Sequence, residues 1–172
     1  MNRDLLQEIY FEYAQEIYLY IYSLCRNEAA AEDLMHDVFV QALMTLSDDH
    51  PNFRAWLYKV AHNLCRNMLR SREYRHSNLI HESAGDDNAC DVLDDMLKTE
   101  RKRQLYLCIN RLPALQKEII FMEYFTDMDC SEIASALDMS QSNVRVVAHR
   151  ARKKLKLLLE RAEKKGDDKH EL

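Results

Sequence analysis

The sequence predicts an all-α protein made of two small helical domains joined by an acidic flexible linker. Apolar residues recur every three or four positions along nearly the whole chain, which is the period of an α-helix. The 172 residues include 2 Gly and 2 Pro, too few for the frequent turns of a β-sandwich or barrel. The periodicity fails over residues 76–97, the predicted linker, and residues 166–172 are predicted to be a disordered tail.

The first predicted domain, residues 1–75, is a bundle of three helices. Apolar residues at helical spacing occupy positions 6–24 in the first. Asn27 suits the N-cap of the second, because its side-chain oxygen can accept a hydrogen bond from an unpaired backbone N–H group. A loop over residues 47–52 precedes the third helix, expected at about residues 52–72. Three amphipathic helices with short connections can bury their apolar faces against one another.

The second predicted domain, residues 98–165, contains four helices. The first is expected to begin near residue 96 and to end before Pro113, because proline disfavours the helical conformation in the residue before it. Pro113 then begins a second helix, which continues to Tyr124. The last two helices are expected over residues 131–137 and 141–165.

The formal net charge of −5 conceals an uneven distribution. Residues 51–80 carry a net charge of +5 and residues 141–165 carry +7, whereas residues 1–50 carry −8 and residues 81–100 carry −6. The acidic total argues against indiscriminate binding to nucleic acid, because phosphate groups attract positive surface. The two basic segments remain candidates for specific contact with nucleic acid.

Several classes of protein and site are excluded by what the sequence lacks. It has no run of 18 uncharged apolar residues, so we expect no membrane insertion, and it has no signal-peptide pattern. The cysteines lie at least 18 residues apart, at Cys25, Cys65, Cys90, Cys108 and Cys130. This spacing fits no zinc site, and an odd number of scattered cysteines favours reduced thiols in a cytoplasmic protein. We therefore expect no metal and no cofactor.

Residues 130–148 fit a helix-turn-helix pattern. Its apolar or small positions are Ile133, Ala134, Leu137, Met139, Val144 and Val147. Ser140 suits the N-cap of the second helix. Asp138 stands where glycine is usual, and aspartate tolerates the left-handed backbone conformation better than most residues. The second helix is therefore predicted to be a recognition helix that enters the major groove of DNA.

Side chains predicted to be exposed on this helix suit DNA. They are Gln141, Ser142, Asn143, Arg145, His149, Arg150 and Arg152. Arginine and amide side chains read base edges in the major groove, and the basic residues that follow suit phosphates. The plain alternative is a pair of packed helices with a solvated charged face.

The third N-terminal helix carries a polar stripe opposite its apolar one. Basic and amide residues recur along it at Lys59, Asn63, Arg66, Asn67 and Arg70, with the aromatics Trp56, Tyr58 and Tyr74 interleaved. Together these residue types suit single-stranded DNA, whose bases can stack on aromatic rings while its phosphates pair with cations. The alternatives are a solvated helix surface for the basic stripe and a core position for Trp56.

The second N-terminal helix is acidic on its exposed side, with Glu28, Glu32, Asp33 and Asp37. A strongly acidic helix beside a DNA-binding one repels the duplex. The pattern therefore favours docking to a protein partner.

Three stretches of the chain resemble bacterial RNA polymerase sigma factors of the extracytoplasmic-function (ECF) subfamily. Residues 31–39, AEDLMHDVF, look like the polymerase-docking helix of that family, and residues 53–63, FRAWLYKVAHN, look like its −10-element helix. The segment from Arg111 to Leu155, which contains the helix-turn-helix, looks like its −35-reading domain. The stretches follow the family's order and spacing, and they cover nearly the whole chain apart from the linker and the tail.

The resemblance implies a promoter-recognition subunit with core RNA polymerase and promoter DNA as partners. Contacts with the β′ clamp helices of polymerase are implied for Glu32, Asp33, His36, Asp37 and Phe39. Asn63 would capture an extruded base of the melted −10 element, and the loop over residues 47–52 would set specificity there. Arg145, Val146 and His149 would touch −35 bases, and Arg150 and Arg152 would lie nearer phosphates. The β flap of polymerase and an anti-sigma factor would be further partners.

Two other classes of function remain open from the sequence. A stand-alone helix-turn-helix regulator would bind operator DNA as a dimer, but it leaves the stripe around Asn63 and the acidic second helix unexplained. An enzyme would need a catalytic cluster, and its candidate groups are His36, Asp37, His62, Cys65, His81 and Cys90. They show neither metal-ligand spacing nor a triad-like arrangement, so we expect no catalytic residues.

Overall fold

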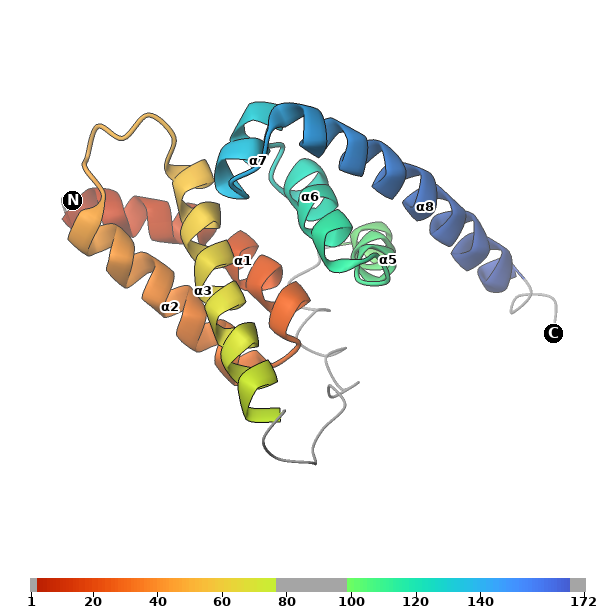
Figure 1. Cartoon of the computed structure of the whole chain (residues 1–172), viewed down its shortest axis with the longest axis horizontal. Coiled ribbons are helices and arrows are strands. Elements are labelled where there is room, and N and C mark those ends of the chain that lie inside the picture. Colours follow the sequence, from red (N-terminus) through yellow and green to blue (C-terminus); the bar gives the residue numbers. More distant parts are fainter. Residues whose placement is uncertain (1–2, 77–98, 168–172) are drawn as a thin grey trace. The chain divides into compact units, whose positions relative to one another are not determined.

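The computed structural model describes residues 3–76 and 99–167, and every regular element in these ranges is an α-helix (Figure 1). The described residues divide into two compact units, one N-terminal and one C-terminal. The predicted linker lies outside the described residues, apart from His76, which ends the last helix of the first unit. Within the two ranges, no helix has both the length and the apolar character needed to cross a membrane.

The N-terminal unit consists of three mutually packed helices: α1 (Arg3–Cys25), α2 (Glu28–Thr45) and α3 (Phe53–His76). Asn27 caps α2 as predicted, because its Oδ1 accepts a hydrogen bond from the Ala30 N–H at 2.8 Å. Asn52 does the same for α3 by accepting from the Ala55 N–H at 2.8 Å, so this helix begins one residue later than expected. It also continues four residues beyond its predicted end at residue 72.

Two tyrosines meet in the core of this unit. Tyr20 and Tyr58 are fully buried, and their rings pack edge to face with centroids 5.0 Å apart. The prediction that Tyr58 lies among aromatics available for stacking on bases is therefore wrong. It faces inward because it shares a helix face with Ala61 and Cys65, three and seven residues further on, which are also buried. Trp56 is half-buried, and the side chain of Tyr74 lies outside the described part.

The C-terminal unit contains α5 (Glu100–Ile109), α6 (Ala114–Phe125), most of α7 (Cys130–Ala136) and α8 (Gln141–Asp167). Thr99 caps α5 by accepting a hydrogen bond from the Lys102 N–H at 3.3 Å, while the predicted start near residue 96 falls outside the described residues. Pro113 occupies the N-cap of α6. The beginning of the predicted tail is helical instead, since α8 continues through Gly166 to Asp167.

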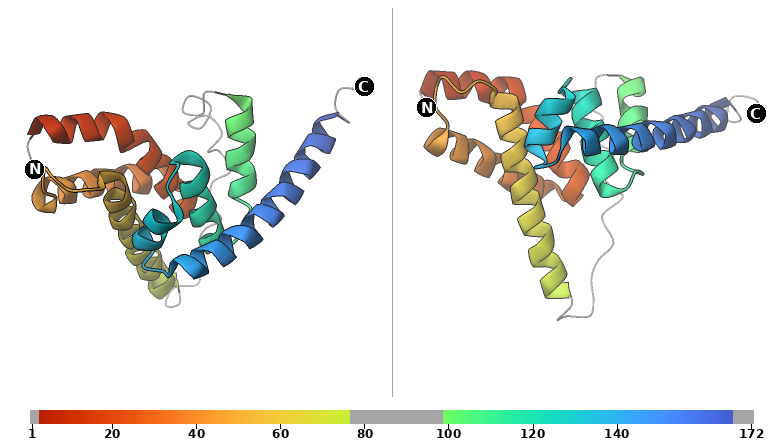
Figure 2. Two further views of the ribbon diagram at one scale, coloured as in Figure 1. Left: turned by 90° about the horizontal axis from the view of Figure 1, so that it is seen from above. Right: turned by 45° about the horizontal axis from the view of Figure 1, so that its top comes forward.

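An aromatic cluster forms the core of this unit. Phe121 and Phe125 stack with ring centroids 4.7 Å apart, and Tyr106 from α5 packs edge-on against both. Helices α5 and α6 also pack against α8, which Figure 2 shows as one continuous helix. The cluster therefore supports the face of α8 opposite the one that it exposes.

Truncation of Tyr58 tests the core of the N-terminal unit. Tyr58→Ala is expected to lower the free energy of unfolding by about 3–5 kcal/mol, the cost of removing a large buried ring. Tyr58→Phe is the matched control and should be close to neutral, because the Tyr58 hydroxyl has no hydrogen-bond partner among the described residues. Urea unfolding of both variants measures the difference. An equally large loss in Tyr58→Phe would contradict this account of the core.

Candidate nucleic-acid interface and docking surface

The helix-turn-helix is built from two capped helices and a tight turn. Asp129 and Glu132 cap α7 reciprocally: Asp129 Oδ1 accepts from the Glu132 N–H at 2.8 Å, and Glu132 Oε2 accepts from the Asp129 N–H at 2.8 Å. Ser140 caps α8, accepting from the Asn143 N–H at 3.3 Å. Between them Asp138 takes the left-handed conformation with φ 51°, as its place in the pattern predicts.

The predicted apolar positions of the motif face inward to different degrees. Four of them, Ile133, Ala134, Leu137 and Val144, are buried. Met139 and Val147 are half-buried and lie at the edge of the core. The outer face of α8 is exposed beside these buried positions.

Every residue that the sequence proposes for −35 contact is exposed on α8. These residues are Gln141, Ser142, Asn143, Arg145, Val146, His149, Arg150 and Arg152. Four of them, Gln141, Ser142, Arg145 and Arg152, already have side-chain partners within the protein. Gln141 Nε2 donates to Ser131 Oγ at 3.2 Å, and its Oε1 accepts from Arg145 Nη2 at 3.5 Å. Arg152 forms an ion pair with Glu123 on α6.

The basic stripe on α3 also lies on the surface. Asn63, Arg66, Asn67 and Arg70 are exposed, and Lys59 is half-buried. Their spacing of three and four residues brings them to one side of the helix, opposite the buried Leu57, Ala61 and Cys65. The helix can therefore present cations and amides without disturbing its own core.

The loop before α3 is held at the end that leads into the helix. His50 Nδ1 accepts a hydrogen bond from the Asn52 N–H at 3.2 Å, and its ring lies 6.0 Å from that of Phe53. The exposed residues of the predicted specificity loop are Ser47, Asp48, Asp49 and Pro51.

Sequence reasoning missed an arginine that ties the first turn of α3 to α1. Arg54 Nε lies 3.8 Å from Glu16 Oε2, and its guanidinium lies over the Tyr13 ring, 5.2 Å from the centroid. Burial and then the nearby Glu12 raise the pKa of Tyr13, so its ring stays neutral. The sequence signal that could have revealed this contact is the spacing of Arg54, which lies three residues before the buried Leu57 and so on the core side of the helix.

The acidic face of α2 is largely as predicted. Glu32, Asp33, His36 and Asp37 are exposed. Burial, followed by the carboxylates of Glu28 and Glu32, raises the pKa of the neighbouring Tyr18 to about 12. The electrostatic field of this face therefore disfavours further negative charge.

Phe39, for which the family resemblance implies a contact with polymerase, lies on the buried side of α2. It is 5% exposed, and its ring packs edge-on against Tyr10 with centroids 4.8 Å apart. The reason is its place on α2, one residue after Val38 and three before Ala42, both fully buried. Phe39 shapes the surface from beneath, while its four polar neighbours are exposed.

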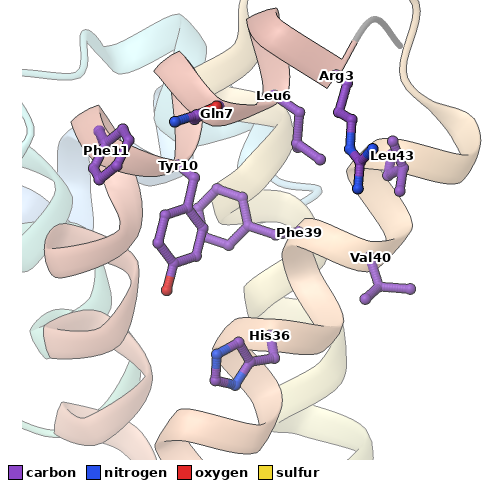
Figure 3. Close-up of a pocket in the computed structure, with 9 residues that line it drawn as sticks. All are labelled: Arg3, Leu6, Gln7, Tyr10, Phe11, His36, Phe39, Val40 and Leu43. Atoms are coloured by element: carbon purple, nitrogen blue, oxygen red, sulfur yellow. The ribbon is translucent and has the colours of Figure 1, made fainter.

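An apolar groove of about 350 Å³ adjoins the acidic face, between α1 and α2 (Figure 3). Its lining consists of Arg3, Leu6, Gln7, Tyr10, Phe11, His36, Phe39, Val40 and Leu43. Phe11 is 76% exposed, Val40 52% and Leu43 44%. Exposed apolar residues gathered at one place indicate a surface that another molecule covers. Sequence reasoning missed the groove, although Val40 lies off the apolar stripe of its helix.

The described residues contain no group of three or more His, Cys, Asp or Glu side chains that could hold a metal ion. Cys25, Cys65 and Cys108 are buried free thiols, and Cys130 is half-buried. Of the catalytic candidates, His81 and Cys90 fall outside the described ranges.

Two sequence-family models match this chain, one in each unit. Residues 4–75 match Sigma-70 region 2, and residues 102–155 match Sigma-70 region 4. The RNA polymerase sigma factor YlaC of Bacillus subtilis is 31% identical over 162 residues, covering 90% of this chain and 92% of YlaC. The ECF RNA polymerase sigma factor SigM of the same organism is 26% identical over 157 residues, covering 91% of this chain and 96% of SigM.

The chain belongs to the ECF RNA polymerase sigma factors. A sigma factor directs promoter recognition by RNA polymerase and is not an enzyme. Family membership therefore decides against the stand-alone regulator and the enzyme. The N-terminal unit carries region 2, and the helix-turn-helix belongs to region 4.

A solved structure shares the fold of this sigma factor. RpoE of Bartonella quintana, co-crystallised with the anti-sigma factor NepR, superposes with a TM-score of 0.72 at 19% identity. The match covers 90% of this chain and 96% of RpoE. Regions 2 and 4 are thus the two helical domains expected from the sequence.

Proposed function

We propose that this sigma factor reads the −35 element as duplex DNA with α8, and holds the −10 element as melted DNA on α3. One observation carries the proposal: two helices in separate units each bury one face and expose a continuous polar face rich in cations and amides. A protein that reads one duplex site needs only one such helix, whereas a promoter offers two elements.

The −35 assignment rests on the first turns of α8. Ser140 and the exposed residues after it stand at a capped helix N-terminus, where recognition helices concentrate their base contacts. Arg145 suits a guanine edge, and the exposed methyl groups of Val146 suit a thymine methyl. Arg150 lies on the outward side of the helix, where a phosphate is accessible.

The −10 assignment rests on Asn63 and its neighbours. An exposed amide can pair with the donors and acceptors of an unstacked base, and Arg66 and Arg70 supply charge for the flanking phosphates. Burial of Tyr58 removes one proposed stacking residue, so hydrogen bonding carries more of this interaction than ring stacking. The exposed residues 47–49 flank the same helix.

Docking to core polymerase is assigned to the acidic face of α2 together with the groove beside it. Exposed carboxylates at Glu32, Asp33 and Asp37 attract a basic partner, and the groove supplies apolar area for it to bury. The partner in this proposal is the pair of β′ clamp helices. Region 4 contacts the β flap, and an anti-sigma factor binds the free protein in the cytoplasm, as NepR binds RpoE in the co-crystal.

Run-off transcription tests the function as a whole. Core polymerase supplied with this protein and fragmented genomic DNA is expected to start at discrete sites that share upstream −35 and −10 elements. Core polymerase alone, and core polymerase with a heat-inactivated sample, are the controls. Transcripts that require another sigma factor would overturn the proposal.

A pair of adjacent residues on α2 tests the docking surface. Leu43 lines the groove and is 44% exposed, whereas Met44 is 77% exposed and lies outside the lining. Leu43→Glu should weaken binding to core polymerase at least about tenfold, because the added carboxylate loses its water when the groove is covered. Met44→Glu should bind within about twofold of the original chain. Fluorescence titration with core polymerase measures both, and equal affinities would contradict the assignment.

Asn63→Ala tests the contact with melted DNA. Open-complex formation should fall roughly tenfold, the loss expected for about 1.4 kcal/mol of hydrogen bonding. Binding of the closed duplex should be unchanged, because the extruded base is absent there. Ser71→Ala, exposed further along the same helix, is the control. Permanganate footprinting and gel-shift titration measure the two steps, and an equal loss in both would exclude the single-strand role.

A further inference from the structure

An ion pair joins the recognition helix to α6 in the C-terminal unit. Arg152 Nη1 on α8 pairs with Glu123 Oε1 on α6, and the two side chains are 45% and 31% exposed. The other carboxylate oxygen, Glu123 Oε2, is buried and has no hydrogen-bond partner among the described residues. An arginine fork can serve both oxygens of one carboxylate, so the geometry leaves room for a second bond to the same partner.

The position of Arg152 on α8 differs from that of its basic neighbours. It follows the buried Ala148 by four residues and precedes the buried Leu155 by three, so it borders the buried face of the helix. Arg150 and Lys153 are turned away from that border by the 100° step per residue. One of the three cations therefore faces α6, and the other two face outward.

A small groove also lies beside Arg152. The groove, of about 200 Å³, lies within the C-terminal unit and is lined by both members of the ion pair. Ile119 and Met128 contribute to the same lining and are buried. Removing Arg152 would leave the Glu123 carboxylate beside apolar side chains without its partner, which is costly in a partly dehydrated site.

We propose that Glu123 is a positioning residue for −35 recognition, and that it holds Arg152 as an internal tie between α6 and α8 instead of a phosphate contact. The tie sets the angle at which α8 presents Arg145 and its neighbours. Phosphate contacts in this turn come from Arg150 and Lys153. The inference rests on the proposed −35 reading and revises the assignment of Arg152 within it.

The salt dependence of promoter binding distinguishes an arginine that contacts a phosphate from one that forms an ion pair within the protein. Each phosphate contact contributes about −0.9 to the slope of log affinity against log salt concentration. Holoenzymes are assembled from core polymerase and the full chain carrying Arg152→Gln, Glu123→Gln or Arg150→Gln, and bound to labelled promoter duplex. Arg150→Gln should reduce the magnitude of the slope by about 0.9, whereas Arg152→Gln and Glu123→Gln should leave it unchanged.

Affinity and stability supply the second readout. Arg152→Gln and Glu123→Gln should weaken promoter binding by a similar factor, about three- to tenfold, and the double variant no further, because both remove one interaction. The charge-swapped variant Glu123→Arg with Arg152→Glu should recover affinity, which a lost phosphate contact could not do. Thermal unfolding of the full chain should show the same non-additivity without DNA.

Distinct outcomes overturn the inference and the function on which it rests. A slope reduced by about 0.9 in Arg152→Gln but not in Glu123→Gln would make Arg152 a phosphate contact. Additive losses of thermal stability in the double variant would show that the two residues act independently. If the original holoenzyme bound promoters with and without a −35 element equally well, the −35 assignment would fail, while the stability cycle would still test the tie.

Discussion

Each functional helix in this sigma factor must serve two surfaces at once, and the rest of the structure depends on that constraint. Helix α3 buries Leu57, Tyr58 and Ala61 while exposing the amides and cations on its other side. Helix α8 likewise buries Val144, Ala148 and Ala151. Because successive residues turn by 100°, a shift of one residue in either pattern would move the cations inward and the apolar residues into water. Core packing therefore fixes which side chains each helix exposes.

The net charge of the chain reflects the separation of basic and acidic residues onto different surfaces. The basic segments coincide with the exposed faces of α3 and α8, and the acidic residues of α2 lie on the surface assigned to polymerase. Opposite charges on separate surfaces allow one protein to attract a polyanion and a basic protein without neutralising itself. The total of −5 limits nonspecific association of the free protein with DNA.

Sequence patterns predicted the features of this fold that depend on local chemistry. Asn27 and Ser140 could be identified as caps because capping requires only a short polar side chain before a helical run. Tyr58 was misassigned because a single helix pattern does not reveal how wide its buried face is, and a tyrosine suits either side. The groove at Tyr10 and Leu43, and the tie from Glu123 to Arg152, join residues far apart in the sequence. Such features depend on how helices pack, which periodicity within one helix does not specify.

Helix α8 is much longer than the segment that carries the proposed −35 contacts, residues 141–152. Its 27 residues extend for about 40 Å at 1.5 Å per residue, and the buried side chains among its residues 141–162 are Val144, Ala148, Ala151 and Leu155. A stiff helix that is held near its middle pivots about that point, which lies close to Arg152. Force applied to the last turns would tilt the first turns in the opposite direction, where the −35 contacts are proposed. A molecule that binds the C-terminal end of α8 without touching DNA could thus change the angle at which the first turns of α8 meet the −35 element.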